Sequence, residues 1–123
     1  MDPWVHIIGG GLSGLSLASS LARFDDLPGR VVISEPNPEA LASKTFSFWF
    51  SSDEEAFLRP QYSNSRWTLS DENHRVAHQG TRFQYGTRSG DHVLDSALQE
   101  IHNHPQIDLV HEFIDMRPHI NKL

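Results

Sequence analysis

The sequence predicts an α/β fold built on a parallel β-sheet, and three observations support this prediction. Residues 4–8 form a short apolar run, rich in β-branched side chains, that ends at three consecutive glycines. Residues 12–24 then place apolar side chains at helical spacing, and residues 30–35 form a second apolar run that stops before a proline. A strand, a helix and a strand in so short a stretch require parallel pairing and a right-handed crossover.

A second helix and a third strand are expected near the end of the chain. The helix is predicted to begin at a cap near Ser89 and to end before Pro105. One face of it carries Val93, Leu94, Ala97, Leu98 and Ile101. Residues 107–113 are interpreted as a third parallel strand, and the strand over residues 30–35 is expected to lie between the other two.

The whole chain, residues 1–123, is predicted to be one domain, with residues 44–88 as an irregular excursion of strands and hairpins inside it. Residues 45–50 place a phenylalanine at every second position, and this alternation predicts a strand. Its apolar face carries Phe46, Phe48 and Phe50, which are interpreted as core residues in preference to a ligand platform.

Three further elements are expected within the excursion. Ser52 and Glu55 have the spacing of a capping box for a short helix that stops at Pro60. Residues 66–69 and 74–77 are predicted to form a hairpin. Residues 81–85 are predicted to form another strand.

The composition argues against several classes of protein. The absence of cysteine excludes disulfides, thiolate-bound metals and a cysteine nucleophile. Ten Lys and Arg against sixteen Asp and Glu give a net charge of −6, which argues against a nucleic-acid partner. No run of about 18 apolar residues and no signal peptide are visible, so a cytoplasmic protein is expected, with peripheral contact to a membrane left open. The apolar share of 37% predicts a thin core, and self-association is one expected consequence.

The most informative motif is Gly9-x-Gly11-x-x-Gly14, placed between the first strand and the first helix. In a dinucleotide-binding turn, the first glycine allows the tight turn, the second lets a pyrophosphate approach the backbone, and the third lets helix and strand pack closely. The N–H groups of Leu12 and Ser13, at the start of the helix, would then face the anion. The alternative is a glycine-rich turn that only packs a helix against a strand.

Glu35 ends the second predicted strand, 21 residues after Gly14. A carboxylate at that distance can accept hydrogen bonds from a ribose diol. Glutamate is compatible with FAD or NAD, and the absence of a neighbouring basic residue argues against NADP. Together with the glycines, it predicts a three-layer Rossmann-like domain that binds FAD or NAD.

Residues 4–18, 31–36 and 44–50 together resemble the start of the lycopene cyclase family, which belongs to the glutathione-reductase-type flavoproteins. The third segment, with its Thr-aromatic-Ser-Phe pattern, carries the most weight, and further similarity extends from Trp67 through Tyr85 to Leu98. The resemblance covers about the first third of a family member, so the domain is expected to be incomplete and the chain to be the amino-terminal part of a longer protein. It implies non-covalently held FAD and, in a full-length protein, a carotenoid or other polyprenoid substrate whose end group is cyclised. The catalytic residues are not identified, because the family's acidic motif has no counterpart here.

Two alternatives to a cyclase remain open. One is another FAD oxidoreductase or monooxygenase acting on a polyprenoid or aromatic substrate, although the arginine-bearing segment expected of a hydroxylase is not recognised. The other is a truncated, non-catalytic nucleotide-binding fragment. A metal site is not expected: His102 and His104 have ligand-like spacing, but no third ligand stands at a fixed distance, and an ordinary solvated loop is the simpler interpretation.

Overall fold

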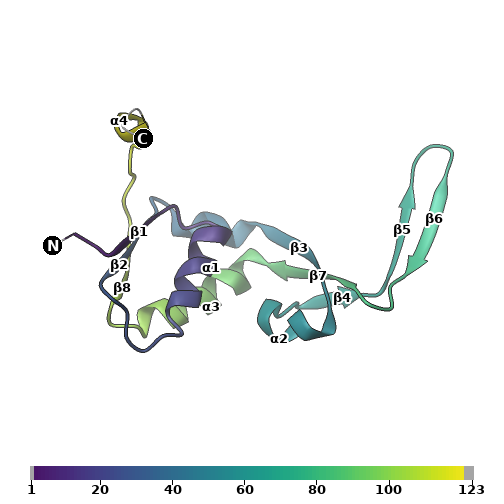
Figure 1. Cartoon of the computed structure of the whole chain (residues 1–123). Helices are drawn as coiled ribbons and strands as arrows, with labels where there is room; N and C mark the ends of the chain where they lie inside the picture. The colour runs from purple at the N-terminus through teal and green to yellow at the C-terminus, as the bar shows by residue number, and fades with distance from the viewer. Residues whose placement is uncertain (1, 121–123) are drawn as a thin grey trace. The chain divides into compact units, whose positions relative to one another are not determined.

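The computed structural model describes residues 2–120, with side chains described up to residue 118 (Figure 1). The chain divides into two compact units, one made of residues 1–43 with 91–123 and the other of residues 44–90. The predicted excursion over residues 44–88 lies within the second unit. Each unit is described by itself.

The first unit is organised around a parallel sheet of three strands, as the sequence predicts. The strands are β1 (Val5–Ile8), β2 (Val31–Ser34) and β8 (Ile107–Val110). They pair in parallel in the order β1-β2-β8, which confirms that the second predicted strand is the central one. The third strand is shorter than the predicted range of 107–113, because β2 ends at Ser34 and Ser34 is paired with Val110.

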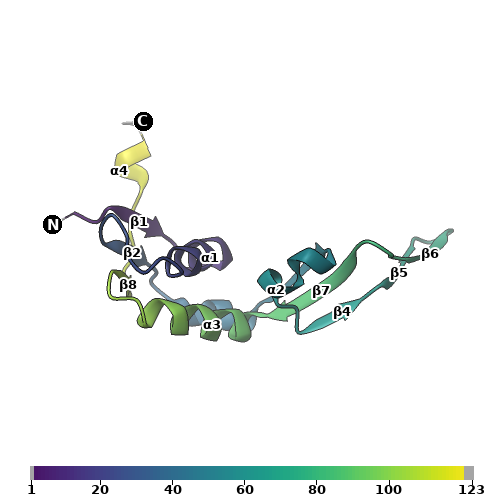
Figure 2. The same ribbon diagram turned by 60° about the horizontal axis from the view of Figure 1, so that its bottom comes forward.

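Two helices connect these strands. Helix α1 (Leu12–Leu21) ends earlier than the predicted residue 24, since the chain enters a series of turns after Leu21. Helix α3 (Gly90–His102) begins directly after the predicted cap near Ser89. Figures 1 and 2 both show α1 and α3 on the same side of the sheet, as two right-handed crossovers that advance in the same direction require.

The core of this unit lies between the sheet and the two helices. Alternate residues of the strands face the helices, and the central strand is buried along its whole length. The buried apolar side chains of the sheet and helices are Ile7, Val31, Val32, Ile33, Ile107, Leu15, Ala18, Val93, Leu94, Ala97 and Ile101. The opposite face of the sheet is more open, because Ile8 is 45% exposed and the side chain of Asp108 is 48% exposed.

Two polar side chains join the loop after α1 to the loop before β8. The side-chain amide of Gln106 bonds both the N–H and the C=O of Leu27, at 2.9 Å each. His104 is buried, and its Nε2 lies 2.7 Å from the carbonyl oxygen of Phe24. The interpretation of this histidine as part of an ordinary solvated loop is therefore wrong: it satisfies backbone groups inside the fold.

The second unit contains a three-stranded antiparallel sheet and a hairpin. Its sheet has the order β3-β7-β4 and consists of β3 (Thr45–Phe50), β7 (Gln84–Ser89) and β4 (Tyr62–Asn64). The hairpin of β5 (Arg66–Ser70) and β6 (Arg75–Gln79) confirms the predicted pairing. Figure 2 shows it as a separate ribbon pair beyond β4 and β7.

The alternation in β3 has the predicted result. Phe50 is almost completely buried, and Phe46 and Phe48 are half-buried on the same face. Phe48 is paired with Gly86 of β7, and a Cβ at Gly86 would come within 3.0 Å of the rings of Phe48 and Phe50. The phenylalanine face therefore packs within its own sheet.

Two predicted elements of this unit are displaced. The capping box is formed by Ser51 and Glu54, not by Ser52 and Glu55, because β3 ends at Phe50 and the chain turns one residue earlier. It precedes a 3-10 turn η2 (Ser52–Glu54) and a short helix α2 (Glu55–Leu58). The strand predicted over residues 81–85 is β7, which begins at Gln84, opposite the end of β3.

Three short elements have no counterpart in the sequence-based prediction. They are strand β4, the 3-10 helix η1 (Pro38–Ser43) and helix α4 (Arg117–Ile120). Within residues 2–120, no helix combines the length and apolar character needed to cross a bilayer.

Candidate functional site

The candidate site is the turn between β1 and α1, together with the end of β2. Gly9 leaves β1 with a φ of +105°, a conformation that L side chains rarely adopt. Its N–H donates to the carbonyl oxygen of Ser34 at 2.9 Å, so the turn is fixed to the central strand. A Cβ built at Gly9 would meet no atom within 4 Å, so the backbone conformation, and not the packing, requires a glycine here.

Gly14 lies in the first turn of α1, directly against the preceding turn. A Cβ at this position would collide with the carbonyl oxygen of Gly9 and would come within 3.2 Å of the Cγ2 of Ile7. The absence of a side chain therefore sets how closely the helix approaches β1. Gly9 and Gly14, five residues apart in sequence, are in direct contact.

Gly11 has a different environment. A Cβ built there meets no atom within 4 Å, and its φ of −77° is accessible to any residue. Neither the backbone nor the protein packing requires a glycine at this position. The glycine at this position would be explained if a ligand had to approach the backbone there.

The N-terminus of α1 has no cap from another part of the chain that the structure describes. Gly11 is the N-cap residue and makes no side-chain cap, and the first turn holds no acidic residue. Among the described residues, no acceptor is bonded to the N–H groups of Leu12 and Ser13. The first N–H groups of a helix lack an intrahelical acceptor and carry the positive end of the helix dipole, so this end of α1 is suited to an anion.

Glu35 directs its carboxylate back toward the glycine turn. Its Oε2 accepts a hydrogen bond from the N–H of Gly10 at 2.7 Å, and its Oε1 accepts one from the N–H of Asn37 at 2.9 Å. The hydrogen bonds from Asn37 and Gly10 hold the pKa of this carboxyl below its ordinary value, so the group is a carboxylate at neutral pH. Each oxygen retains acceptor capacity for a further donor, such as a ribose hydroxyl.

Gly10 is a site residue that the sequence-based reasoning missed. A Cβ there would lie 2.8 Å from the Cβ of Glu35, so a glycine is needed for the carboxylate to reach the turn. The sequence did contain a signal for Gly10. The motif needs Gly9 and Gly11 but not the glycine between them, so a third consecutive glycine indicates a separate requirement. The contribution of Asn37 comes from its backbone and carries no sequence signal.

The arrangement fits the phosphates and ribose of a dinucleotide. An uncapped helix end, an open approach at Gly11 and a carboxylate at the tip of the adjacent strand stand at the carboxyl ends of β1 and β2. That edge is where ligands bind in open parallel sheets. The roles expected of Gly9, Gly11, Leu12, Ser13, Gly14 and Glu35 are compatible with this geometry and remain predictions.

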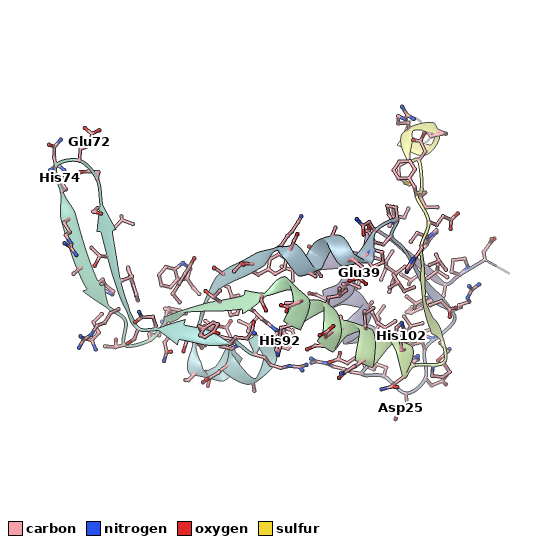
Figure 3. The ribbon with its side chains drawn as sticks, turned by 180° about the vertical axis from the view of Figure 1, so that it is seen from behind. Asp25, Glu39, Glu72, His74, His92 and His102 are labelled. Carbon is pink, nitrogen blue, oxygen red and sulfur yellow. The ribbon has the colours of Figure 1, made fainter. Side chains whose placement is uncertain are left out.

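The histidines whose side chains are described form no comparable site. Figure 3 shows His92 at the beginning and His102 at the end of α3, and His74 at the tip of the β5–β6 hairpin. Among the described side chains, those of residues 2–118, no group of three or more His, Asp or Glu is arranged to hold a metal ion.

The fold and the site thus define an α/β unit in which a glycine-rich turn joins a parallel strand to a helix, and comparison with solved structures agrees with this fold. The chain is similar to PqsL from Pseudomonas aeruginosa, described as a probable FAD-dependent monooxygenase, with a TM-score of 0.61 and 14% identity over 88% of the chain. A variant of PqsL with four substitutions gives a TM-score of 0.64 at 15% identity over 88% of the chain. A point mutant of MHPCO gives a TM-score of 0.55 at 15% identity over 89% of the chain.

These similarities concern the fold. The chain spans about a third of the length of these structures: 32% of PqsL, 33% of its variant and 32% of MHPCO. No protein-family model matches the sequence, and no curated protein matches it. The chain therefore has the fold of part of an FAD-dependent monooxygenase.

Proposed function

We propose that this chain is the FAD-binding portion of a flavoenzyme and that it holds the ADP half of the cofactor. One observation carries the proposal: the open, uncapped N-terminus of α1 stands beside the carboxylate of Glu35, which is bonded to the same turn through Gly10. Leu12 and Ser13 would donate to the pyrophosphate, and Glu35 would accept from the ribose. FAD, when bound, supplies two-electron redox chemistry.

The proposal is tested by titrating ADP, FAD and NAD by calorimetry. We expect Gly11→Val to abolish ADP binding, because the added side chain would occupy the approach to the backbone. The variant is expected to fold, since no protein atom lies within 4 Å of its Cβ and the φ suits valine. Ser16→Val, one turn further along α1 on an exposed position, is the matched control and should bind ADP as the wild type does.

Two results would contradict parts of this proposal. If ADP binds no better to the wild type than to Gly11→Val, the glycines serve packing alone and the nucleotide site is wrong. If NAD binds at least as tightly as FAD, the nucleotide site stands but the flavoprotein assignment fails.

We further propose the reaction of the whole protein: acid-initiated cyclisation of the end group of a linear carotenoid. The resemblance of residues 44–50 to the lycopene cyclase family supports it. The description of PqsL as a probable FAD-dependent monooxygenase supports the alternative, oxygenation of an aromatic or polyprenoid substrate. The protein that carries this chain, loaded with FAD, should convert lycopene to a product of unchanged mass if it is a cyclase. Consumption of oxygen and a product with one added oxygen atom would instead establish the monooxygenase.

A further inference from the structure

Residues 44–90 form a cavity, open to the surface, that the nucleotide site does not use. It has a volume of about 430 Å³ and is walled by Trp49, Trp67, His78, Gly80, Arg82 and Phe83. All of these residues belong to the second unit, so the cavity is complete within that unit. Its volume is in the range of about 300–1,000 Å³ that is usual for small-molecule sites.

Aromatic rings form a continuous row along this cavity. Trp49 and Tyr85 are cross-strand partners in β3 and β7, with ring centroids 4.8 Å apart. Trp67 and His78 are cross-strand partners in β5 and β6, with centroids 4.6 Å apart. A contact of 4.7 Å between Trp49 and Trp67 joins the two pairs, so the row links the three-stranded sheet to the hairpin.

The ring of Trp67 is held in a defined position. A Cβ at Gly80 would lie 2.8 Å and 2.9 Å from two ring carbons of Trp67, so the indole packs directly on the backbone of Gly80. The N–H of Gly80 in turn donates to the carbonyl oxygen of Ser65. Trp49 is nevertheless 51% exposed and Phe83 is 43% exposed, so apolar ring surface remains open to a ligand.

One cation stands at this aromatic wall. The Cζ of Arg82 lies 5.2 Å from the centroid of the Phe83 ring, within the range of a cation–π contact. Among the described residues, no carboxylate is within salt-bridge distance of the Arg82 guanidinium. Asp53 and Glu54 line a neighbouring hollow together with Arg82 and Phe83, so the site holds carboxylates near the guanidinium although none pairs with it.

We infer that this cavity binds a planar aromatic carboxylate. Its rings would pack against Trp49 and Trp67, and its carboxylate would pair with the guanidinium of Arg82. Flat aromatic surfaces select planar apolar groups, and the guanidinium fork matches the geometry of a carboxylate. This inference does not depend on nucleotide binding in the first unit.

The test is a titration of the 123-residue chain with 2-naphthoate, followed by ¹H–¹⁵N spectra of the tryptophan indoles. The chain has three tryptophans, and only Trp49 and Trp67 line the cavity. Their indole signals should shift on binding, whereas that of Trp4, in the first unit, should not. The neutral isostere 2-naphthamide should bind at least about tenfold more weakly, because it lacks the charge-assisted hydrogen bonds to Arg82.

Two variants assign the selectivity to Arg82. Arg82→Met keeps an apolar stem and should remove the preference for naphthoate over naphthamide. Arg75→Met, in β6 and outside this cavity, is the matched control and should retain the preference. Unchanged backbone signals of β3 and β7 would show that each variant is folded.

Any of four outcomes with naphthoate and naphthamide would overturn the inference. They are an absence of shifts at Trp49 and Trp67, an equal shift at Trp4, equal affinity for the amide, and unaltered selectivity in Arg82→Met. Riboflavin serves as a planar competitor without a carboxylate, and its binding at least as tightly as naphthoate would overturn the inference as well. Failure of ADP to bind would leave the inference untouched, because the nucleotide site lies in the other unit.

Discussion

The carboxylate of Glu35 accepts hydrogen bonds from two parts of the backbone, the glycine turn after β1 and the loop after β2. Its oxygens accept the N–H groups of Gly10 and Asn37, so it stabilises the turn even before any ligand binds. The two bonds go to different oxygens, and in a glutamine one of these positions is an NH2 group, which donates and cannot accept. Glu35→Gln is therefore expected to lower the stability of the chain as well as its affinity for nucleotide.

The affinity part of this effect is predicted to be near tenfold. A hydrogen bond to a charged group contributes about 1.5–3 kcal/mol, against roughly 1 kcal/mol for a neutral one, and about 1.4 kcal/mol corresponds to a factor of ten. The measurement is the ADP dissociation constant of wild type and Glu35→Gln, at a temperature where both are fully folded. An unchanged constant would mean that the carboxylate serves the turn alone and does not contact the ribose.

The stability part depends on pH in a direction that follows from the lowered pKa. The folded-state pKa of Glu35 lies below the ordinary value of 4.5, so the unfolded chain binds the proton more readily. The contribution is fully present above about pH 4.5 and is lost as the pH falls through the folded-state pKa. We expect the stability difference between wild type and Glu35→Gln, measured by urea unfolding, to shrink as the pH is lowered from neutral into this range.

A second carboxylate has a shift of the same sign, so the comparison must be made between variants. The pKa of Asp71 is also lowered, because its carboxylate accepts the N–H groups of Asn73 and His74 in the hairpin turn. Asp71 lies in the other unit and is unaltered in Glu35→Gln, so its contribution cancels in the difference. A wild-type advantage that stays constant with pH would contradict the role given to Glu35.

At the scale of elements, the packing of α1 on β1 depends on a single missing side chain. Gly14→Ala would place a methyl group against the carbonyl oxygen of Gly9, so the helix must move away from the strand. Overpacking of this kind costs about 1–3 kcal/mol. We expect a loss of that size in the free energy of unfolding.

Gly11→Ala is the matched control for this prediction. It makes the same chemical change three residues earlier, where no protein atom lies within 4 Å and φ is −77°. Its stability should stay within about 1 kcal/mol of wild type, since Gly and Ala differ there only in backbone entropy and cap preference. Equal losses in the two variants would show that Gly14 does not govern the helix–strand contact.

At the scale of the whole molecule, the sheet of the first unit has two edges that no other described strand pairs with. Within residues 2–120, β1 and β8 each have a neighbour on one side only, and one face of the sheet carries the half-exposed Ile8 and Asp108. Unpaired edges of parallel strands pair readily with another chain. The phenylalanine face of β3 is packed against Gly86, so it offers less surface for association than the sequence suggests.

We therefore predict that the 123-residue chain is marginally stable and self-associates. It should melt at or below the range of about 45–65 °C that is usual for mesophilic domains. Sedimentation velocity at increasing protein concentration should show a rising weight-average mass. A monodisperse monomer with a high melting temperature would contradict the prediction.

The sequence by itself determined the elements whose signals are local. The period of the apolar residues placed β1, β2, α1, α3 and β3, and the glycine spacing placed the turn between β1 and α1. These signals depend on side chains within one or two turns of each other, so they can be recognised without knowledge of the fold. The order of the parallel strands followed because a right-handed crossover allows few alternatives.

The tertiary structure decided where elements end and which distant residues meet. β7 begins at Gln84 because its partner β3 ends at Phe50, and β8 ends at Val110 because β2 ends at Ser34. Ser51 and Ser52 each have a glutamate three residues later, as a capping box requires. Because β3 ends at Phe50, the cap is formed by Ser51. A strand boundary depends on the partner strand, which sequence periodicity does not contain.

The same reason separates the two sites. The nucleotide site is readable in the sequence because its glycines are close together and its acidic residue stands at a fixed distance along the chain. The bond from Gly10 to Glu35 and the row from Tyr85 through Trp49 and Trp67 to His78 were not predicted. These contacts join residues on different elements, and only the registers of the strand pairs and the approach of Trp67 in the hairpin to Trp49 in the sheet bring them within reach.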